Sequence, residues 1–261
     1  MALYNVGLNG LIGGLGSLIN QKDRDADFET FARGFYKGAA GGYLSHIGFT
    51  MTHRISKKEN IAFAWPARLV NSLGSSMVQN AAENRKMFER LHFNLLLTRL
   101  EYNTQQRKFK IRLFTSSLYG LAVVGRGARF DLGKTLKSGI FYFESEGRFS
   151  SSLGSGRATG QVSSIGMRAD LTGSEFYDVF AEEVAHIIQY DRKVGGNAFA
   201  QGWDANLKES SQFYRGLAKY VYFDLNGPIF WLAYKIEDST QCHFFEQEAV
   251  NYANKRLDIC N

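Results

Sequence analysis

The chain has 261 residues, of which 44% are hydrophobic and 21% charged, and its formal net charge is +6. This composition excludes an intrinsically disordered chain, and the length suffices for a sizeable core in one large domain or two small ones. Acidic residues lie among the basic ones and no nucleic-acid module signature is visible, so we expect a mildly basic solvated surface and no nucleic-acid partner.

The first 90 residues are rich in glycine, as in NVGLNGLIGGLGSLIN at 5–20 and FARGFYKGAAGGYLSHIGF at 31–49. Glycines spaced three or four residues apart on one helix face let another backbone approach closely. A series of glycine turns is the alternative for residues 5–20. Acidic residues at the start of DFETFARGFYKG indicate a helix from residue 27, and a further helix is expected at 67–90, after the turn signal Trp65-Pro66.

The sequence predicts no membrane-spanning segment, because the longest apolar run, residues 10–19, is far shorter than the ~20 residues that a spanning helix needs. The first ten residues lack the basic region and the cleavage site of a secretory signal. We therefore expect either a cytosolic protein or an exported one whose signal has been removed.

Residues 91–170 are typical of strands. HFNLLLTRLEYN at 92–103 and RKFKIRLFTSS at 107–117 are strand-like, and the residues between them suit a hairpin. In the second stretch Phe109, Ile111 and Leu113 alternate with Lys108, Lys110 and Arg112, which predicts a half-buried strand. Two more strands are expected at 139–145 and 164–171, with a mobile Gly/Ser loop at 147–161 between them.

The last third of the chain has helical periodicity. Ser174 is a candidate N-cap, and Tyr177, Phe180, Val184 and Ile187 or Ile188 form an apolar stripe. Further helices are expected near 206–220, 227–236 and 242–257. Without a repeat or a clear linker, the chain is interpreted as one α+β domain at 1–261. It consists of glycine-rich helices at 1–90, a small and mostly antiparallel sheet at 91–170, and a helical part at 171–261.

Cys242 and Cys260 lie close enough in the sequence to close a small loop. A disulfide between them would contribute about 3 kcal/mol and would favour an oxidising compartment. Two unconnected thiols are the alternative.

The stretch FAEEVAHIIQYD at 180–191 differs from the zinc-peptidase pattern H-E-x-x-H only at its first position, Glu182. On a helix, Glu182 and His186 lie one turn apart on the same face and can bind one metal from the same side. Glu183 would then act as general base on the metal-bound water. Taken alone, such a pattern is more often an ordinary solvated helix face.

A downstream segment supplies a candidate third ligand. HFFEQEAVNYANKR, at 243–256, together with the motif at 182–186 resembles the gluzincin metallopeptidases, which combine H-E-x-x-H with a later glutamate in E-x-x-A-D. Position by position, Glu246 matches the third ligand and Ala249 the alanine, whereas Val250 stands where the family has an aspartate. His243 is a possible replacement ligand, although a surface or capping role suits it better.

The resemblance implies a metal set of Glu182, His186 and Glu246, with two departures from the family. Glu182 replaces a histidine, and Val250 removes a carboxylate of the kind that orients metal ligands. Two carboxylates and one imidazole suit manganese or iron at least as well as zinc. Without a metal, the three neighbouring glutamates would need protons or basic partners.

Most of the chain also resembles a family of exported proteins from Bacteroidetes-type bacteria, through NVGLNGLIGGLGSLIN, GFYKGAAGGYL, WPARLVNSLGSSMVQNAAEN and NGPIFW followed by FFEQEA. Its members often retain H-E-x-x-H where this chain has Glu182. The resemblance implies a relation to the plug subunit of the outer-membrane translocon of type 9 secretion. It therefore implies a periplasmic, outer-membrane-associated protein that occludes and does not turn over substrate.

Three functions follow as hypotheses. The leading one is a non-catalytic interaction protein on a degenerate gluzincin-like scaffold, docked to a larger protein complex of the envelope. The rival is a metal-dependent peptidase or hydrolase in which Glu183 is the catalytic base. The third is a structural protein whose carboxylates pair with Arg or Lys, so that Glu182 or Glu246 would have a basic partner.

Overall fold

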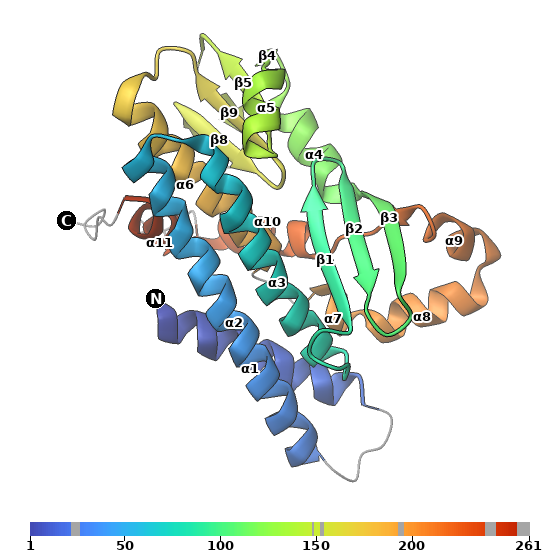
Figure 1. Cartoon of the computed structure of the whole chain (residues 1–261). Helices are drawn as coiled ribbons and strands as arrows, with labels where there is room; N and C mark the ends of the chain where they lie inside the picture. The colour runs from blue at the N-terminus through green and yellow to red at the C-terminus, as the bar shows by residue number, and fades with distance from the viewer. Residues whose placement is uncertain (22–26, 148, 152–153, 193–195, 238–243, 255–261) are drawn as a thin grey trace.

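The computed structural model describes residues 1–21, 27–147, 149–151, 154–192, 196–237 and 244–254 (Figure 1). The helices are α1 (Ala2–Ile19), α2 (Asp27–Lys58), α3 (Ala64–Ala82), α4 (Thr115–Val124), α5 (Leu132–Ser138), α6 (Gly173–Arg192), α7 (Gly196–Phe199), α8 (Gln201–Ser210), α9 (Gln212–Leu217), α10 (Asn226–Glu237) and α11 (Phe244–Asn254), with a 3-10 turn at Ile61–Phe63. The strands are β1 (Arg90–Leu95), β2 (Thr98–Asn103), β3 (Lys108–Phe114), β4 (Arg129–Phe130), β5 (Phe141–Ser145), β6 (Phe149–Ser151), β7 (Gly154–Gly156), β8 (Ala158–Gln161), β9 (Ser164–Arg168) and β10 (Val221–Tyr222). This content confirms the α+β fold class.

Glycines hold α1, α2 and α3 together at close range. A Cβ added at Gly38 would lie 2.3 Å from the carbonyl oxygen of Asn9, and one added at Gly74 would lie 2.5 Å from that of Gly41. Only glycine lets helix backbones approach this closely without a clash. The one-face interpretation of the glycines is confirmed, and the alternative of glycine turns at 5–20 is wrong because α1 is a continuous helix.

The boundaries of α3 differ from the expected 67–90. The helix begins at Ala64, so Pro66 lies in its first turn. The N–H groups of the first turn have no intrahelical acceptor, so a proline there costs no hydrogen bond. It ends at Ala82, and turn residues then lead to β1 at Arg90. Trp65-Pro66 therefore starts this helix and does not precede it.

The β-rich part forms two four-stranded sheets among the described residues, where one small sheet was expected. The first sheet has the order β1-β2-β3-β10 and the second the order β4-β5-β9-β8, and β6 pairs with β7 in a separate hairpin. The pairings β3–β10 and β5–β9 are parallel, and the other described ones are antiparallel. HFNLLLTRLEYN is a hairpin and not one strand, because Leu96 turns the chain with φ +52° between β1 and β2.

The first sheet turns its polar face inward. Its register places apolar side chains on one face: Leu91, Phe93, Leu95, Leu100, Tyr102, Phe109, Ile111 and Leu113. On the opposite face Asn94, Arg99 and Glu101 are buried. The prediction that Phe109 and Ile111 belong to a buried face is wrong, since each is 58% exposed.

The surface that α3 offers to the sheet explains this inversion. Ser75 contacts the side-chain Nε2 of His92 at 3.1 Å, and Gln79 accepts a hydrogen bond from Arg99 at 2.8 Å. Apolar strand residues at these places would leave buried polar groups of α3 without partners, which costs about 1–3 kcal/mol per group.

Three further expectations about elements need correction. The Gly/Ser segment 147–161 forms β6, β7 and β8 where it is described, because β8 pairs with β9 and packs on α6. The helix expected near 206–220 is two helices, α8 and α9. Helix α6 begins at Gly173, so Ser174 lies inside its first turn.

Helix α6 lies at the centre of the largest hydrophobic core. Phe180, Val184, Ile187 and Ile188 are fully buried there, together with Ala249 of α11 and Phe49 of α2, and Tyr177 packs against them partly buried. The predicted apolar stripe of α6 is therefore confirmed.

Helix α1 is long and apolar enough to cross a membrane by length and composition alone, and 44% of it is buried in the structure. Buried core helices and N-terminal signal sequences meet the same criterion. The expected absence of a membrane-spanning segment stays a prediction.

Candidate functional site

The three predicted metal ligands meet in space. Glu182 and His186 project from α6, and Glu246 from the first turn of α11, which packs against α6 in the main hydrophobic core. One ligand atom of each of the three residues lies within 4.8 Å of the other two, and His186 Nε2 is 3.3 Å from Glu246 Oε2. Ligands of a tetrahedral metal at about 2.1 Å are spaced about 3.4 Å apart. The described atoms would therefore draw slightly closer around an ion.

His186 is oriented by a chain of hydrogen bonds between α6 and α11. Its Nδ1 lies 3.0 Å from Gln189 Oε1. The Gln189 amide donates at 2.9 Å to Glu248 Oε2 and at 2.8 Å to the carbonyl oxygen of Phe245. Both Gln189 and Glu248 are fully buried. Such partners fix the orientation of a metal-binding imidazole, and Glu248 provides here a carboxylate that the Val250 position lacks.

Glu183 is the residue that the sequence predicts as general base. It is 8% exposed, and burial raises its pKa to about 8. His186 acts against this rise, Glu182 and Glu246 add to it, and the backbone N–H of Gly160 lowers the pKa. A carboxyl group with a pKa near neutrality suits proton transfer.

The pKa of His186 is raised by its neighbours, although burial acts in the other direction. Burial would lower its pKa, but the ion pair with Glu246 and the charges of Glu183 and Glu182 outweigh burial and raise the pKa to about 10. Glu246 therefore has a basic partner, but the partner is this imidazole and not the Arg or Lys that the third hypothesis names.

Strand β8 runs along the site. A Cβ added at Gly160 would lie 2.7 Å from the backbone oxygen of Glu183 and 2.8 Å from its Oε2. Glycine is required for this contact between the edge strand and α6. The sequence interpretation placed Gly160 in a loop and missed its role, because the contact joins elements whose pairing no local pattern reveals.

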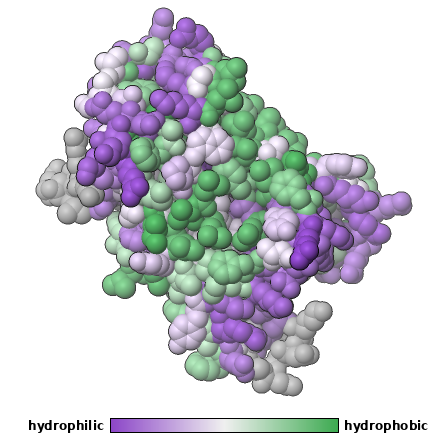
Figure 2. All heavy atoms as spheres, in the orientation of Figure 1, coloured by the Kyte–Doolittle hydropathy of each residue, from purple (hydrophilic) through white to green (hydrophobic). Residues whose placement is uncertain are grey.

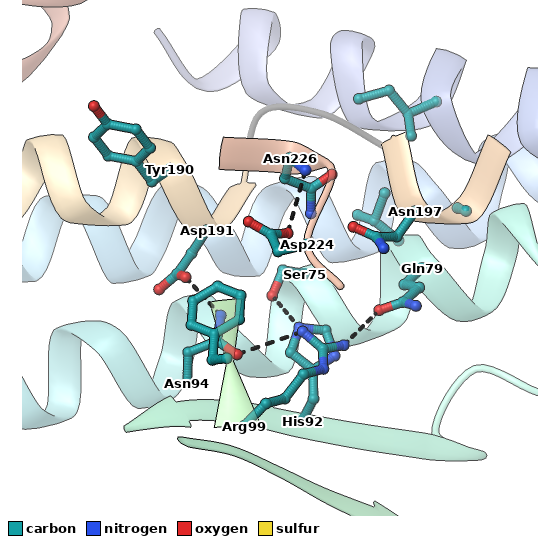
Figure 3. Close-up of a pocket in the computed structure, with 14 residues that line it drawn as sticks. Ser75, Gln79, His92, Asn94, Arg99, Tyr190, Asp191, Asn197, Asp224 and Asn226 are labelled. Atoms are coloured by element: carbon teal, nitrogen blue, oxygen red, sulfur yellow. Dashed lines mark hydrogen bonds between the residues drawn. The ribbon is translucent and has the colours of Figure 1, made fainter. Parts of the chain in front are cut away.

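A second polar centre lies beneath the first sheet and was not predicted (Figure 3). A cavity of about 40 Å³ is lined by Asp191 and Tyr190 of α6, by Asp224, and by polar residues of α3 and the sheet. Asn94 donates to Asp191 at 2.8 Å, and Ser75 contacts His92 Nε2 at 3.1 Å. Polar residues at alternate positions of 90–103 were the available signal.

His243, Cys242 and Cys260 lie outside the described residues, so the replacement-ligand and disulfide expectations stay predictions. Comparison of the chain with protein-family models, with curated proteins and with solved structures gave no match.

Proposed function

We propose that this chain is a non-catalytic interaction protein on a degenerate metallopeptidase-like scaffold, which docks onto a larger protein complex. The observation that carries the proposal is the apolar face of the first sheet, defined by the eight residues Leu91, Phe93, Leu95, Leu100, Tyr102, Phe109, Ile111 and Leu113. Tyr102, Phe109 and Ile111 are exposed on this face, and its other five residues are half-buried. A contiguous apolar surface with exposed large side chains marks interaction sites in folded proteins.

The apolar face continues onto α3. Trp65 lies 6.1 Å from Phe93 between ring centroids, and Leu69 and Leu73 follow Trp65 at intervals of one helical turn. Leu69 is 49% and Leu73 36% exposed. In the view of Figure 2, hydrophobic side chains form a broad band across the middle of the visible face, over the region where Figure 1 draws α3 and the sheet.

The chemistry of this surface favours a protein partner with an apolar patch bordered by carboxylates. Arg107 is exposed in the β2–β3 hairpin, at the edge of the apolar face beside Phe109 and Ile111, and Lys108 and Lys110 are exposed on the opposite face of the same strand. A second copy of this chain would bring a like net charge of +6 to the contact. The sequence resemblance makes an outer-membrane translocon in the periplasm our choice of partner.

The scaffold is consistent with lost catalysis. The position of the first family histidine is Glu182, and the remaining histidine is ion-paired with Glu246 at 3.3 Å. A protein that occludes a channel needs no reactive water, so exchange of a ligand there is tolerated.

The test is equilibrium binding of the full chain to the purified translocon. Phe109→Gln combined with Ile111→Gln should weaken binding at least tenfold, because large apolar side chains at the centre of an interface dominate its energy. Phe213→Gln is the matched control, since Phe213 is 80% exposed on α9, away from the apolar face. Equal binding by the double variant would overturn the proposal. The proposal would also be overturned if the wild-type chain did not bind the translocon and instead formed a stable dimer or bound anionic vesicles.

A metal-dependent hydrolase is the second candidate, and the convergence of Glu182, His186 and Glu246 within 4.8 Å favours it. In that case the native protein contains stoichiometric metal, and Glu183→Gln abolishes hydrolysis without unfolding the chain. Glu175→Gln, on the exposed first turn of the same helix, is the control. Metal-free native protein without hydrolytic activity would remove this candidate.

A further inference from the structure

A cleft lies at one end of the first sheet, next to its buried polar face. The cleft has a volume of about 260 Å³ and lies between the ends of α3, β1 and β3 on one side and α7, α8 and α9 on the other. In the described structure α8 and α9 bury none of their residues, so they border this space without filling it.

The wall formed by α3 and the sheet is cationic. Arg85, Arg90 and Arg112 line it, and Lys208 faces them from α8. One carboxylate, Glu83, serves two of these guanidinium groups, with Arg85 at 2.8 Å and Arg90 at 3.8 Å. Lys208 pairs with Asp204, and Arg112 shares the carboxylate of Glu101 with Arg99. The arginines at this wall therefore outnumber their carboxylates, because Glu83 and Glu101 are each shared by two guanidinium groups.

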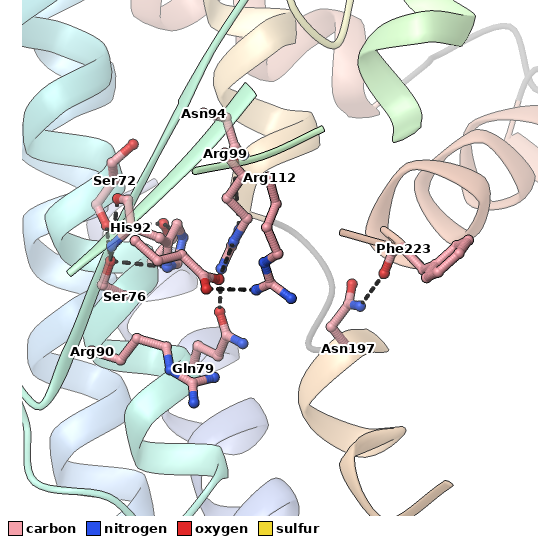
Figure 4. Close-up of polar contacts among 12 residues, drawn as sticks. Ser72, Ser76, Gln79, Arg90, His92, Asn94, Arg99, Arg112, Asn197 and Phe223 are labelled. Carbon is pink, nitrogen blue, oxygen red and sulfur yellow. Dashed lines mark hydrogen bonds and ion pairs between the residues drawn. The ribbon is translucent and has the colours of Figure 1, made fainter. Parts of the chain in front are cut away.

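Two residues that line the cleft each carry a buried donor without a hydrogen-bond partner among the described residues. The donors are the hydroxyl of Tyr222, a residue that is 7% exposed, and Nε of Arg112. Two guanidinium groups lie over the Tyr222 ring, with Arg99 at 4.1 Å and Arg112 at 4.8 Å from its centroid. Figure 4 shows Arg112 extending from its strand toward Asn197, with Arg90 beside Gln79. Unsatisfied buried donors beside excess positive charge are the arrangement that an oxyanion completes.

The opposite side of the cleft is aromatic. Trp203 is 60% exposed at its edge, and Tyr214 stacks on Phe223 with centroids 5.5 Å apart. We propose that this basic cleft binds a small organic oxyanion, with its phosphate or carboxylate on the arginines and its apolar part against Trp203. The site is separate from the apolar face and from the Glu182 site.

Calorimetric titration of the full chain with phenyl phosphate, benzoate and benzyl alcohol tests the proposal. The two anions should bind with a Kd of about 1 mM or below, and the neutral alcohol should not. Preference between the anions identifies a phosphate or a carboxylate as the natural head group. Binding should quench the fluorescence of Trp203, and Trp203→Phe should abolish that signal.

Arg90→Gln and Lys208→Gln should each weaken anion binding about tenfold, the loss expected for one charge-assisted contact. Lys137→Gln removes the same charge from α5, outside the residues that line the cleft, and should leave binding unchanged. No saturable binding, equal binding of benzyl alcohol, or equal losses in all three variants would overturn the proposal. Circular dichroism of each variant verifies that it is folded.

Discussion

Glu101 is a buried carboxylate between two guanidinium groups. It contacts Arg99 at 2.8 Å and Arg112 at 2.5 Å, and it is 6% exposed. Burial alone would raise its pKa, but these two arginines hold the pKa well below its ordinary value. The charged carboxylate therefore contributes stability that is fully present above about pH 4.5 and is lost as the pH falls.

Replacement of this carboxylate should lower the free energy of unfolding and should reduce its dependence on pH under acidic conditions. Glu101→Gln leaves two buried guanidinium groups without their partner, which predicts a loss of about 3–5 kcal/mol in the free energy of unfolding at pH 7. Urea denaturation at pH 7 and pH 4 measures both effects. Glu175→Gln, which breaks an exposed pair with Arg157, should cost at most about 0.5 kcal/mol. Equal losses in the two variants would contradict the assigned role of Glu101.

Glu182→His creates the H-E-x-x-H pattern on α6. If the site has decayed from a metallopeptidase, the variant gains zinc affinity, because Glu246 and His186 already lie within reach of position 182. Elemental analysis after dialysis measures the gain, and Glu175→His on the same helix controls for nonspecific binding. Zinc content that does not rise above that control would contradict the decayed-site interpretation.

The ligands of this site were predictable, but their surroundings were not. Helical spacing placed Glu182 and His186 on one face, and the family resemblance selected Glu246, all of which the structure brings together. The hydrogen-bond relay through Gln189 and Glu248, and the contact of Gly160 with Glu183, depend on tertiary packing. No periodicity in one segment specifies which other segment covers it.

At the scale of elements, a substitution at Gly74 tests how tightly α2 and α3 pack. A Cβ at position 74 would meet backbone atoms, with the Gly41 oxygen at 2.5 Å and the Ser45 nitrogen at 2.6 Å. Gly74→Ala should therefore destabilise the protein by about 1–3 kcal/mol, although alanine is the better helix former.

Gly7→Ala is the matched control for this helix contact. Nothing lies within 4 Å of a Cβ at Gly7 in α1, so that substitution should stabilise the protein by up to about 1 kcal/mol. Chemical denaturation of both variants measures the difference. A stabilising Gly74→Ala would show that the helices can separate at little cost.

The elements show where local pattern fails. Alternation in 108–113 correctly predicted a strand, but alternation alone cannot say which face is buried. The polar face is the buried one because it packs against the serine-rich surface of α3, whose buried polar groups need hydrogen-bond partners. The segment 147–161 was read as a loop from its Gly/Ser content, yet β8 forms there because β9 and α6 supply its partners.

At the scale of the whole molecule, burial is unevenly distributed. Helix α6 contributes fully buried residues to the main core, whereas α8 and α9 contribute none in the described structure. Regions with few buried apolar contacts open at lower free energy than the core does. The wall of the basic cleft is therefore expected to be the more labile part of the fold, and α6 the most stable.

Native-state amide hydrogen exchange should resolve this difference. Amides in the middle of α6 should exchange only through global unfolding, while those of α8 and α9 should exchange through local opening several kcal/mol below it. Phenyl phosphate, if it binds across the cleft, should slow exchange in α8 and α9 and leave the apolar face of the first sheet unchanged. Exchange in α8 and α9 as slow as in α6 would contradict this distribution of stability. Protection by the ligand confined to the apolar face would show that the anion binds elsewhere.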